Sequence, residues 1–119
     1  MNYTEEYVKE ILQKIINDLD EWRGEESYYD KEVPFIAYYQ ENQKNLYNKT
    51  IIKHAWIVKA TVPKDGWKGG FIIIVINDDT GKAINYMNSA LGGRPITLPL
   101  EIDENGTYFI PPEVLPQKE

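Results

Sequence analysis

Cysteine is absent from this chain of 119 residues, and histidine occurs once, at position 54. Without cysteine, disulfides, thiolate catalysis and zinc-thiolate sites are all excluded. A serine triad would have to use His54 with Ser27 or Ser89, and neither serine lies in a nucleophile-elbow motif. No second histidine stands at a metal-ligand spacing from His54. We therefore expect no enzyme activity, no metal and no cofactor, and we assign no catalytic residue.

Long apolar runs are also absent. The longest one, Phe71–Ile76, is far too short to span a membrane. The first ten residues contain no apolar region of the kind that a secretory signal peptide has. From these two features we expect a cytoplasmic protein that does not bind membranes.

Positive charge is scarce, since 13 basic residues stand against 19 acidic ones and leave a net charge of −6. A nucleic-acid-binding protein needs a basic surface, so nucleic acid is not the expected partner. The balance favours a basic protein partner, or simply serves solubility. The charge is uneven: residues 1–50 hold 11 acids and six bases, residues 51–100 hold three and six, and residues 101–119 hold five and one.

Apolar residues make up 42% of the chain and aromatic residues 13%, which is enough for one folded domain with its own core. The clearest element is a helix over residues 4–22, for which Asn2 or Thr4 is a suitable N-cap and Gly24 a suitable C-cap. One stripe of apolar residues repeats at helical spacing: Val8, Ile11, Leu12, Ile15, Ile16, Leu19 and Trp22.

Strands are predicted at about residues 33–39, 54–62, 70–76 and 82–87, with a tight turn at Asn77–Lys82 between the last two. A C-terminal hairpin is predicted within 96–110, followed by an extended tail over 111–119. The polar stretch 40–53 is predicted to be a loop. In the second strand Trp56, Val58, Ala60 and Val62 form the expected core face, which the helix would cover. Phe71–Ile76 is apolar at every position, as in a strand buried on both faces or one that meets a partner on its second face. The pattern predicts an α+β fold, with an N-terminal amphipathic helix packed on a mainly antiparallel sheet.

The connector 24–32, GEESYYDKE, combines acids with two adjacent tyrosines. Two interpretations fit this composition. The connector is a solvated loop or the tail of a bent helix, with no binding role, or it is part of a binding face for a cationic partner. If it is a binding face, the candidate partner-binding residues are Glu25, Glu26, Tyr28, Tyr29 and Asp30 of the connector, together with Trp67 from a later loop.

An ordered series of motifs spans Val33 to Met87. Pro34-Phe35 opens one strand, and Trp56-Ile57-Val58 begins the next, which runs to Pro63. Gly69-Gly70 precedes Phe71–Ile76, and Asp78-Asp79-Thr80-Gly81-Lys82 leads into the return strand. This order resembles the small immunity proteins of bacterial polymorphic-toxin systems that adopt the nuclear transport factor 2 fold. The resemblance implies a helix lying in a curved, cone-shaped, cystatin-like sheet, a cytoplasmic location, no enzyme activity, and tight binding of a cognate toxin domain. We expect the chain to be a monomer or a weak dimer.

Two alternatives remain open. Cone-shaped folds often hold an apolar cavity, so the chain could be a small-ligand-binding protein or an enzyme whose pocket is lined by Tyr38, His54, Tyr86 and Tyr108. An apolar strand followed by D-x-T-G-K also resembles the PepSY module, which implies an inhibitory domain.

Overall fold

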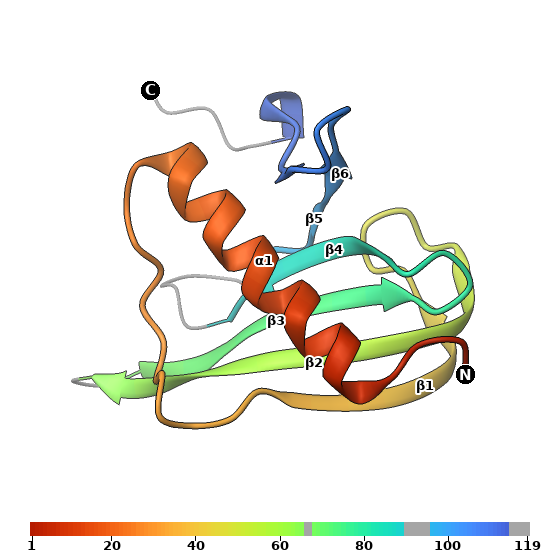
Figure 1. The fold of residues 1–119 in the computed structure, drawn as a ribbon, viewed down its shortest axis with the longest axis horizontal. Helices are drawn as coiled ribbons and strands as arrows, with labels where there is room; N and C mark the ends of the chain where they lie inside the picture. The colour runs from red at the N-terminus through yellow and green to blue at the C-terminus, as the bar shows by residue number, and fades with distance from the viewer. Residues whose placement is uncertain (66–67, 90–95, 115–119) are drawn as a thin grey trace.

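The computed structural model describes residues 1–65, 68–89 and 96–114 (Figure 1). Their elements in chain order are α1 (Glu5–Arg23), β1 (Ile36–Lys44), β2 (Ile51–Asp65), β3 (Lys68–Asn77), β4 (Lys82–Asn88), β5 (Leu98–Pro99), β6 (Glu101–Ile102), β7 (Tyr108–Phe109) and the short 3-10 helix η1 (Pro112–Val114). The predicted α+β class is confirmed: one N-terminal helix lies across one face of an antiparallel sheet.

Helix α1 begins and ends where its capping residues predict. The Thr4 side chain accepts a hydrogen bond from the Tyr7 N–H at 3.1 Å, and Gly24 takes a left-handed conformation with φ of 74°. Glu5 and Glu6 occupy the first turn, where the helix dipole favours negative charge. The apolar stripe is buried at Val8, Leu12, Ile15, Ile16 and Leu19.

The main sheet has the strand order β1-β2-β3-β4-β5, with every neighbouring pair antiparallel, and it is not closed into a barrel. A tight turn with Gly81 at φ of 73° joins β3 to β4. The strands β6 and β7 form a separate two-stranded ladder beside the C-terminal half of α1 (Figure 1).

The core fills the space between α1 and the sheet. Alternate residues of β3, Ile72, Ile74 and Ile76, are fully buried on the helix side. The predicted core face of β2 is confirmed, since Trp56, Val58, Ala60 and Val62 all belong to the same cluster. Phe71, Ile73 and Val75 point to the opposite face and are only half-buried, and none of the described helices lies over them.

The prediction for residues 33–53 was wrong in part. The first strand lies at Ile36–Lys44 and not at 33–39, and β2 already begins at Ile51, so the predicted loop shrinks to residues 45–50. The register with β2 explains the difference: polar positions such as Gln40 and Gln43 pair with Ala55 and Ile52. An edge strand takes its conformation from such non-local pairing and tolerates polar side chains, so local composition underestimates it.

The C-terminal segment also differs from its prediction. The hairpin exists across Asp103–Gly106, but its strands are only two residues long. Leu98–Pro99 pairs with β4 instead, and the Leu100 N–H donates to the Ile84 carbonyl at 2.9 Å. Of the predicted tail, Pro112–Val114 form η1, and residues 115–119 lie outside the described residues.

A buried carboxylate fixes the start of the chain to the β3–β4 turn. Asp78, only 2% exposed, accepts hydrogen bonds from the backbone N–H groups of Asn2 and Tyr3 at 2.7 and 3.1 Å. It also accepts the indole N–H of Trp56 at 3.0 Å. Burial alone raises the pKa of Asp78, but these three hydrogen bonds and the positive charge of the chain's N-terminus outweigh it and hold the pKa below its ordinary value.

This lowered pKa gives a pH dependence with a definite sign. A carboxylate whose pKa is lower in the folded state stabilises the fold above its unfolded pKa, about 3.9 for aspartate, and this stabilisation is lost as the pH falls through the folded-state value. We expect the difference in unfolding free energy between the natural chain and Asp78→Asn to be constant above about pH 5 and to shrink below about pH 4. Urea titrations of both proteins from pH 7 to pH 3 measure it. A difference that grows on acidification would show that Asp78 is not held as the anion.

Candidate binding surfaces

Almost all of the net charge is concentrated at the end of α1 and in the connector that follows it. Residues 18–32 contain seven acidic and two basic side chains, a net charge of −5 against −6 for the whole chain. Two large aromatic side chains are exposed within this stretch, Trp22 at 44% and Tyr28 at 58%. We call residues 18–32 the acidic segment. Its combination of negative charge and exposed aromatic rings suits a cationic protein surface.

The acidic segment is held in place by its own contacts. The Asp30 N–H donates to the Thr61 carbonyl of β2 at 2.8 Å, and the Asp30 side chain accepts the Glu32 N–H at 3.0 Å. Tyr29 packs on Phe35 with ring centroids 6.0 Å apart. The segment therefore presents its charges from a backbone that is anchored to the sheet.

The predicted partner-binding residues divide into two groups. Glu25, Glu26 and Tyr28 are exposed, although Glu26 pairs with Lys31 and raises the pKa of that lysine. Tyr29 and Asp30 are half-buried and serve the anchoring contacts just described. Trp67 lies outside the described residues. Three carboxylates of the acidic segment, those of Glu21, Glu25 and Glu32, have no hydrogen bond or ion pair within the described part of the chain.

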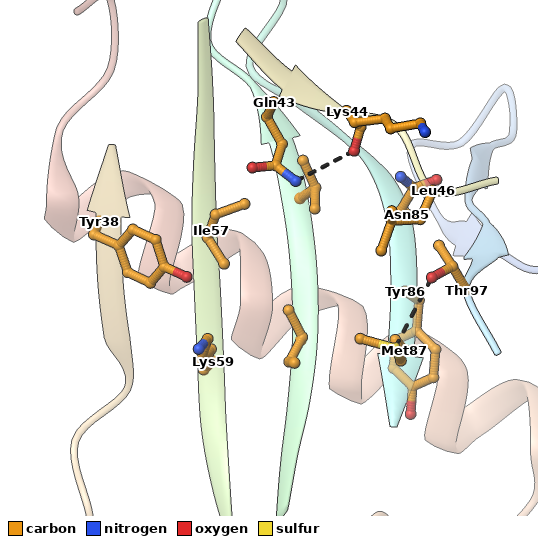
Figure 2. A pocket seen from close by; sticks show the side chains of 12 residues that line it. Tyr38, Gln43, Lys44, Leu46, Ile57, Lys59, Asn85, Tyr86, Met87 and Thr97 are labelled. Atoms are coloured by element: carbon orange, nitrogen blue, oxygen red, sulfur yellow. Dashed lines mark hydrogen bonds between the residues drawn. The ribbon is translucent and has the colours of Figure 1, made fainter. Parts of the chain in front are cut away.

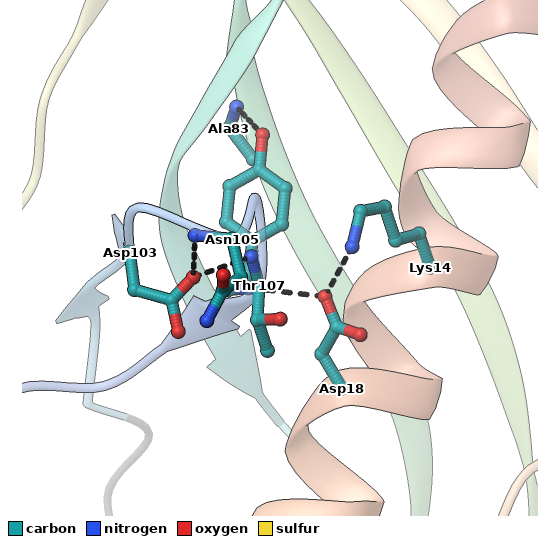
Figure 3. Close-up of polar contacts among 7 residues, drawn as sticks. Lys14, Asp18, Ala83, Asp103, Asn105 and Thr107 are labelled. Carbon is teal, nitrogen blue, oxygen red and sulfur yellow. Dashed lines mark hydrogen bonds and ion pairs between the residues drawn. The ribbon is translucent and has the colours of Figure 1, made fainter.

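The four residues predicted to line one cavity are not brought together. The His54 ring is hydrogen-bonded through Nδ1 to the Tyr39 hydroxyl at 2.6 Å. Tyr108 lies in the core, where its hydroxyl oxygen accepts the Ala83 N–H at 3.1 Å. Its own N–H donates to Asp18 at 3.0 Å, and Asp18 in turn pairs with Lys14 (Figure 3). The space between helix and sheet is filled by core side chains that include Leu19 and Trp56.

Tyr38 and Tyr86 do line a common pocket, but it opens on the other face of the sheet. Figure 2 shows it with α1 behind the strands. The pocket has a volume of about 190 Å³, and its apolar floor comes from Ile57, Ile73, Val75 and Met87. We call the face of the sheet that lies opposite α1, on which this pocket opens, the open face. Sequence reasoning missed the pocket, although the second apolar side of Phe71–Ile76 was a signal for it.

The structure also bears on metal and membrane sites. Within residues 1–65, 68–89 and 96–114, no group of three or more His, Cys, Asp and Glu side chains is placed to hold a metal ion. None of the helices in the same ranges has both the length and the apolar character that crossing a bilayer requires.

Comparison with known proteins adds no relative. A scan against protein-family models, a search of curated proteins and a search of solved structures each found no match for this chain. A function must therefore be argued from the surfaces themselves.

Proposed function

We propose that this chain is a non-enzymatic immunity protein that binds and neutralises a basic bacterial toxin domain in the cytoplasm. The observation that carries the proposal is the acidic segment, where residues 18–32 hold a net charge of −5 beside the exposed rings of Trp22 and Tyr28. Toxin domains that cleave nucleic acid need basic clefts to bind their substrate. A concentrated acidic surface would attract such a cleft over distance and cover it.

The geometry supports binding by a preformed surface. The connector is tied to β2 through Asp30, so little backbone order has to be gained on association. The exposed aromatic rings supply the apolar contact that charge alone does not, because binding energy in interfaces concentrates in buried aromatic anchors. The resemblance of Val33–Met87 to immunity proteins is independent of this surface and leads to the same proposal.

The test begins with the partner. The immobilised chain should retain, from a lysate of its source organism, a protein with a basic toxin domain whose expression stops bacterial growth. Coexpression of this chain should restore growth. If growth is not restored, neutralisation is excluded even where the two proteins bind.

Charge reversal then tests the surface. The triple variant Glu21→Lys, Glu25→Lys, Glu32→Lys changes only carboxylates without partners in the described residues. We expect its association rate with the captured toxin to fall by about 10- to 100-fold at low ionic strength, because attraction becomes repulsion. Stopped-flow or surface-plasmon measurements give this rate.

The matched control carries the same change of charge elsewhere: Glu41→Lys, Glu101→Lys, Glu104→Lys, all exposed side chains on other elements. We expect it to slow association by less than about threefold. Equal effects of the two triple variants would show that only the total charge matters, and would reject the acidic segment as the binding surface.

A further inference from the structure

The pocket on the open face has the size of a small-molecule site. Its volume is about 190 Å³, somewhat larger than the roughly 150 Å³ cavity that accommodates benzene in a protein interior. The floor is apolar, and Tyr38 contributes aromatic surface at its side (Figure 2). A ring or a short branched chain would fit this space, whereas a long lipid chain would not.

One polar group in the wall has an unmet hydrogen-bonding capacity. Asn85 is 4% exposed, and its Oδ1 atom has no hydrogen-bond partner among the described residues. The orientation of its amide is fixed, because the Nδ2 group donates at 3.0 Å to Asn45 Oδ1, which also accepts the Tyr47 N–H at 2.9 Å. A buried acceptor without a partner is costly, so it points to a donor that is supplied from outside.

A bulge places this acceptor. Asn85 pairs with Val75 while Ala83 pairs with Ile76, so Ile84 is an extra residue on β4. Bulges redirect side chains and are frequent beside functional sites. The turn 45–50, which holds Asn45 and the exposed Leu46, lies against the same wall, and Leu46 lines the pocket together with Asn85.

A positive charge lies at another part of the rim. The Lys59 ammonium group lies 5.4 Å from the Tyr38 ring centroid and 5.1 Å from that of Phe71. No carboxylate lies within ion-pairing distance of it in the part of the chain that the structure describes. The two rings hold the amine over the open face, where it can bind an anion.

The geometry points to a binding site for a small amphipathic carboxylate, with an aromatic or branched apolar body and a hydrogen-bond donor at its far end. The carboxylate binds Lys59, the body lies on Ile73 and Val75, and the donor reaches Asn85 Oδ1. Lys59 pairs with Ile73, and Asn85 pairs with Val75, which puts the two groups two strands and two residues apart. From strand spacings, their Cα atoms are on the order of 12 Å apart, which suits one substituted ring with a short acidic chain. This site is separate from the acidic segment and does not depend on the proposed toxin.

The test uses para-hydroxyphenylpropionate as the probe and the intact chain labelled for NMR. We expect a dissociation constant on the order of 1 mM, as ligands of this size allow, with shifts at Ile57, Ile73 and Val75. Phenylpropionate, which lacks the donor, and para-hydroxyphenylpropionamide, which lacks the charge, should each bind about tenfold more weakly.

Two variants locate the contact. Lys59→Met keeps the apolar stem and should weaken binding of the acid about tenfold without affecting the amide. Lys53→Met removes the same charge from an exposed position of β2 and should change neither the binding of the acid nor that of the amide. Equal effects of the two variants, or no shifts on the open face, would overturn the proposal. So would a dimer that covers Ile73 in the natural chain, because it would assign the face to self-association.

Discussion

Replacement of Asp78 with alanine is expected to lower the free energy of unfolding by about 4 kcal/mol, the largest effect we predict for a single polar residue. The carboxylate accepts three hydrogen bonds, and its removal leaves the indole N–H of Trp56 buried without a partner. It also releases Asn2 and Tyr3, which lead into the N-cap of α1. Urea denaturation followed by tryptophan fluorescence measures the change.

Asp79 provides the matched control. It is the neighbouring residue in the same turn, it is exposed, and its side chain makes no hydrogen bond or ion pair within the described residues. Asp79→Ala should change the unfolding free energy by less than about 0.5 kcal/mol. If the two alanine variants were equally stable, the turn would matter for its backbone only, and the carboxylate would not hold the N-terminal segment.

The second large effect is expected at Gly81, where replacement with alanine should lower the free energy of unfolding by about 3 kcal/mol. Two causes add. The residue has φ of 73°, which costs a side-chain-bearing residue about 1–2 kcal/mol, and a Cβ atom would lie 2.5 Å from Cζ of Tyr3. The Tyr3 ring must then leave its stacked position on Tyr7, where the ring centroids are 4.6 Å apart. Loss of such a pair costs about 1 kcal/mol. Thermal unfolding of Gly81→Ala and of the natural chain, followed by circular dichroism, measures this loss of stability.

Gly106 separates the two causes, because it has φ of 80° but no atom within 4 Å of the place that a Cβ atom would take. Gly106→Ala should therefore lower the free energy of unfolding only by the cost of a positive φ for a residue with a side chain, about 1–2 kcal/mol. In a Tyr3→Ala background the excess cost at Gly81 should disappear, since the ring is no longer there to be displaced. An excess that persists in that background would mean that Tyr3 is not what the new side chain meets.

The fold could be predicted where one local pattern was sufficient. The stripe from Val8 to Leu19 defines a helix by its spacing alone, and Gly24 ends it. The unbroken apolar run Phe71–Ile76 indicated a central strand with two apolar faces, which the structure shows. By contrast, β1 was displaced in the prediction because its polar residues become strand only through pairing with β2, information that local sequence does not contain.

The candidate sites were less predictable, because they depend on which distant residues meet. The excess of acid in 18–32 is visible in the sequence, and so is the pair Tyr28-Tyr29, but only packing shows that Tyr29 anchors the connector while Tyr28 is exposed. The unpaired oxygen of Asn85 arises from a contact with Asn45, 40 residues earlier. Asp78 was interpreted as a turn residue, since nothing local indicates that the chain start returns to it.

Hydrogen exchange on this chain, alone and bound to the toxin domain that we propose as its partner, is the sharpest test of whether the acidic segment forms the binding surface. We expect the protection gained in the complex to be largest at the amides of the connector 24–32 and of the last turn of α1, with β1–β4 little changed. Protection centred on the strands of the open face, with exchange in the connector unaltered, would contradict it.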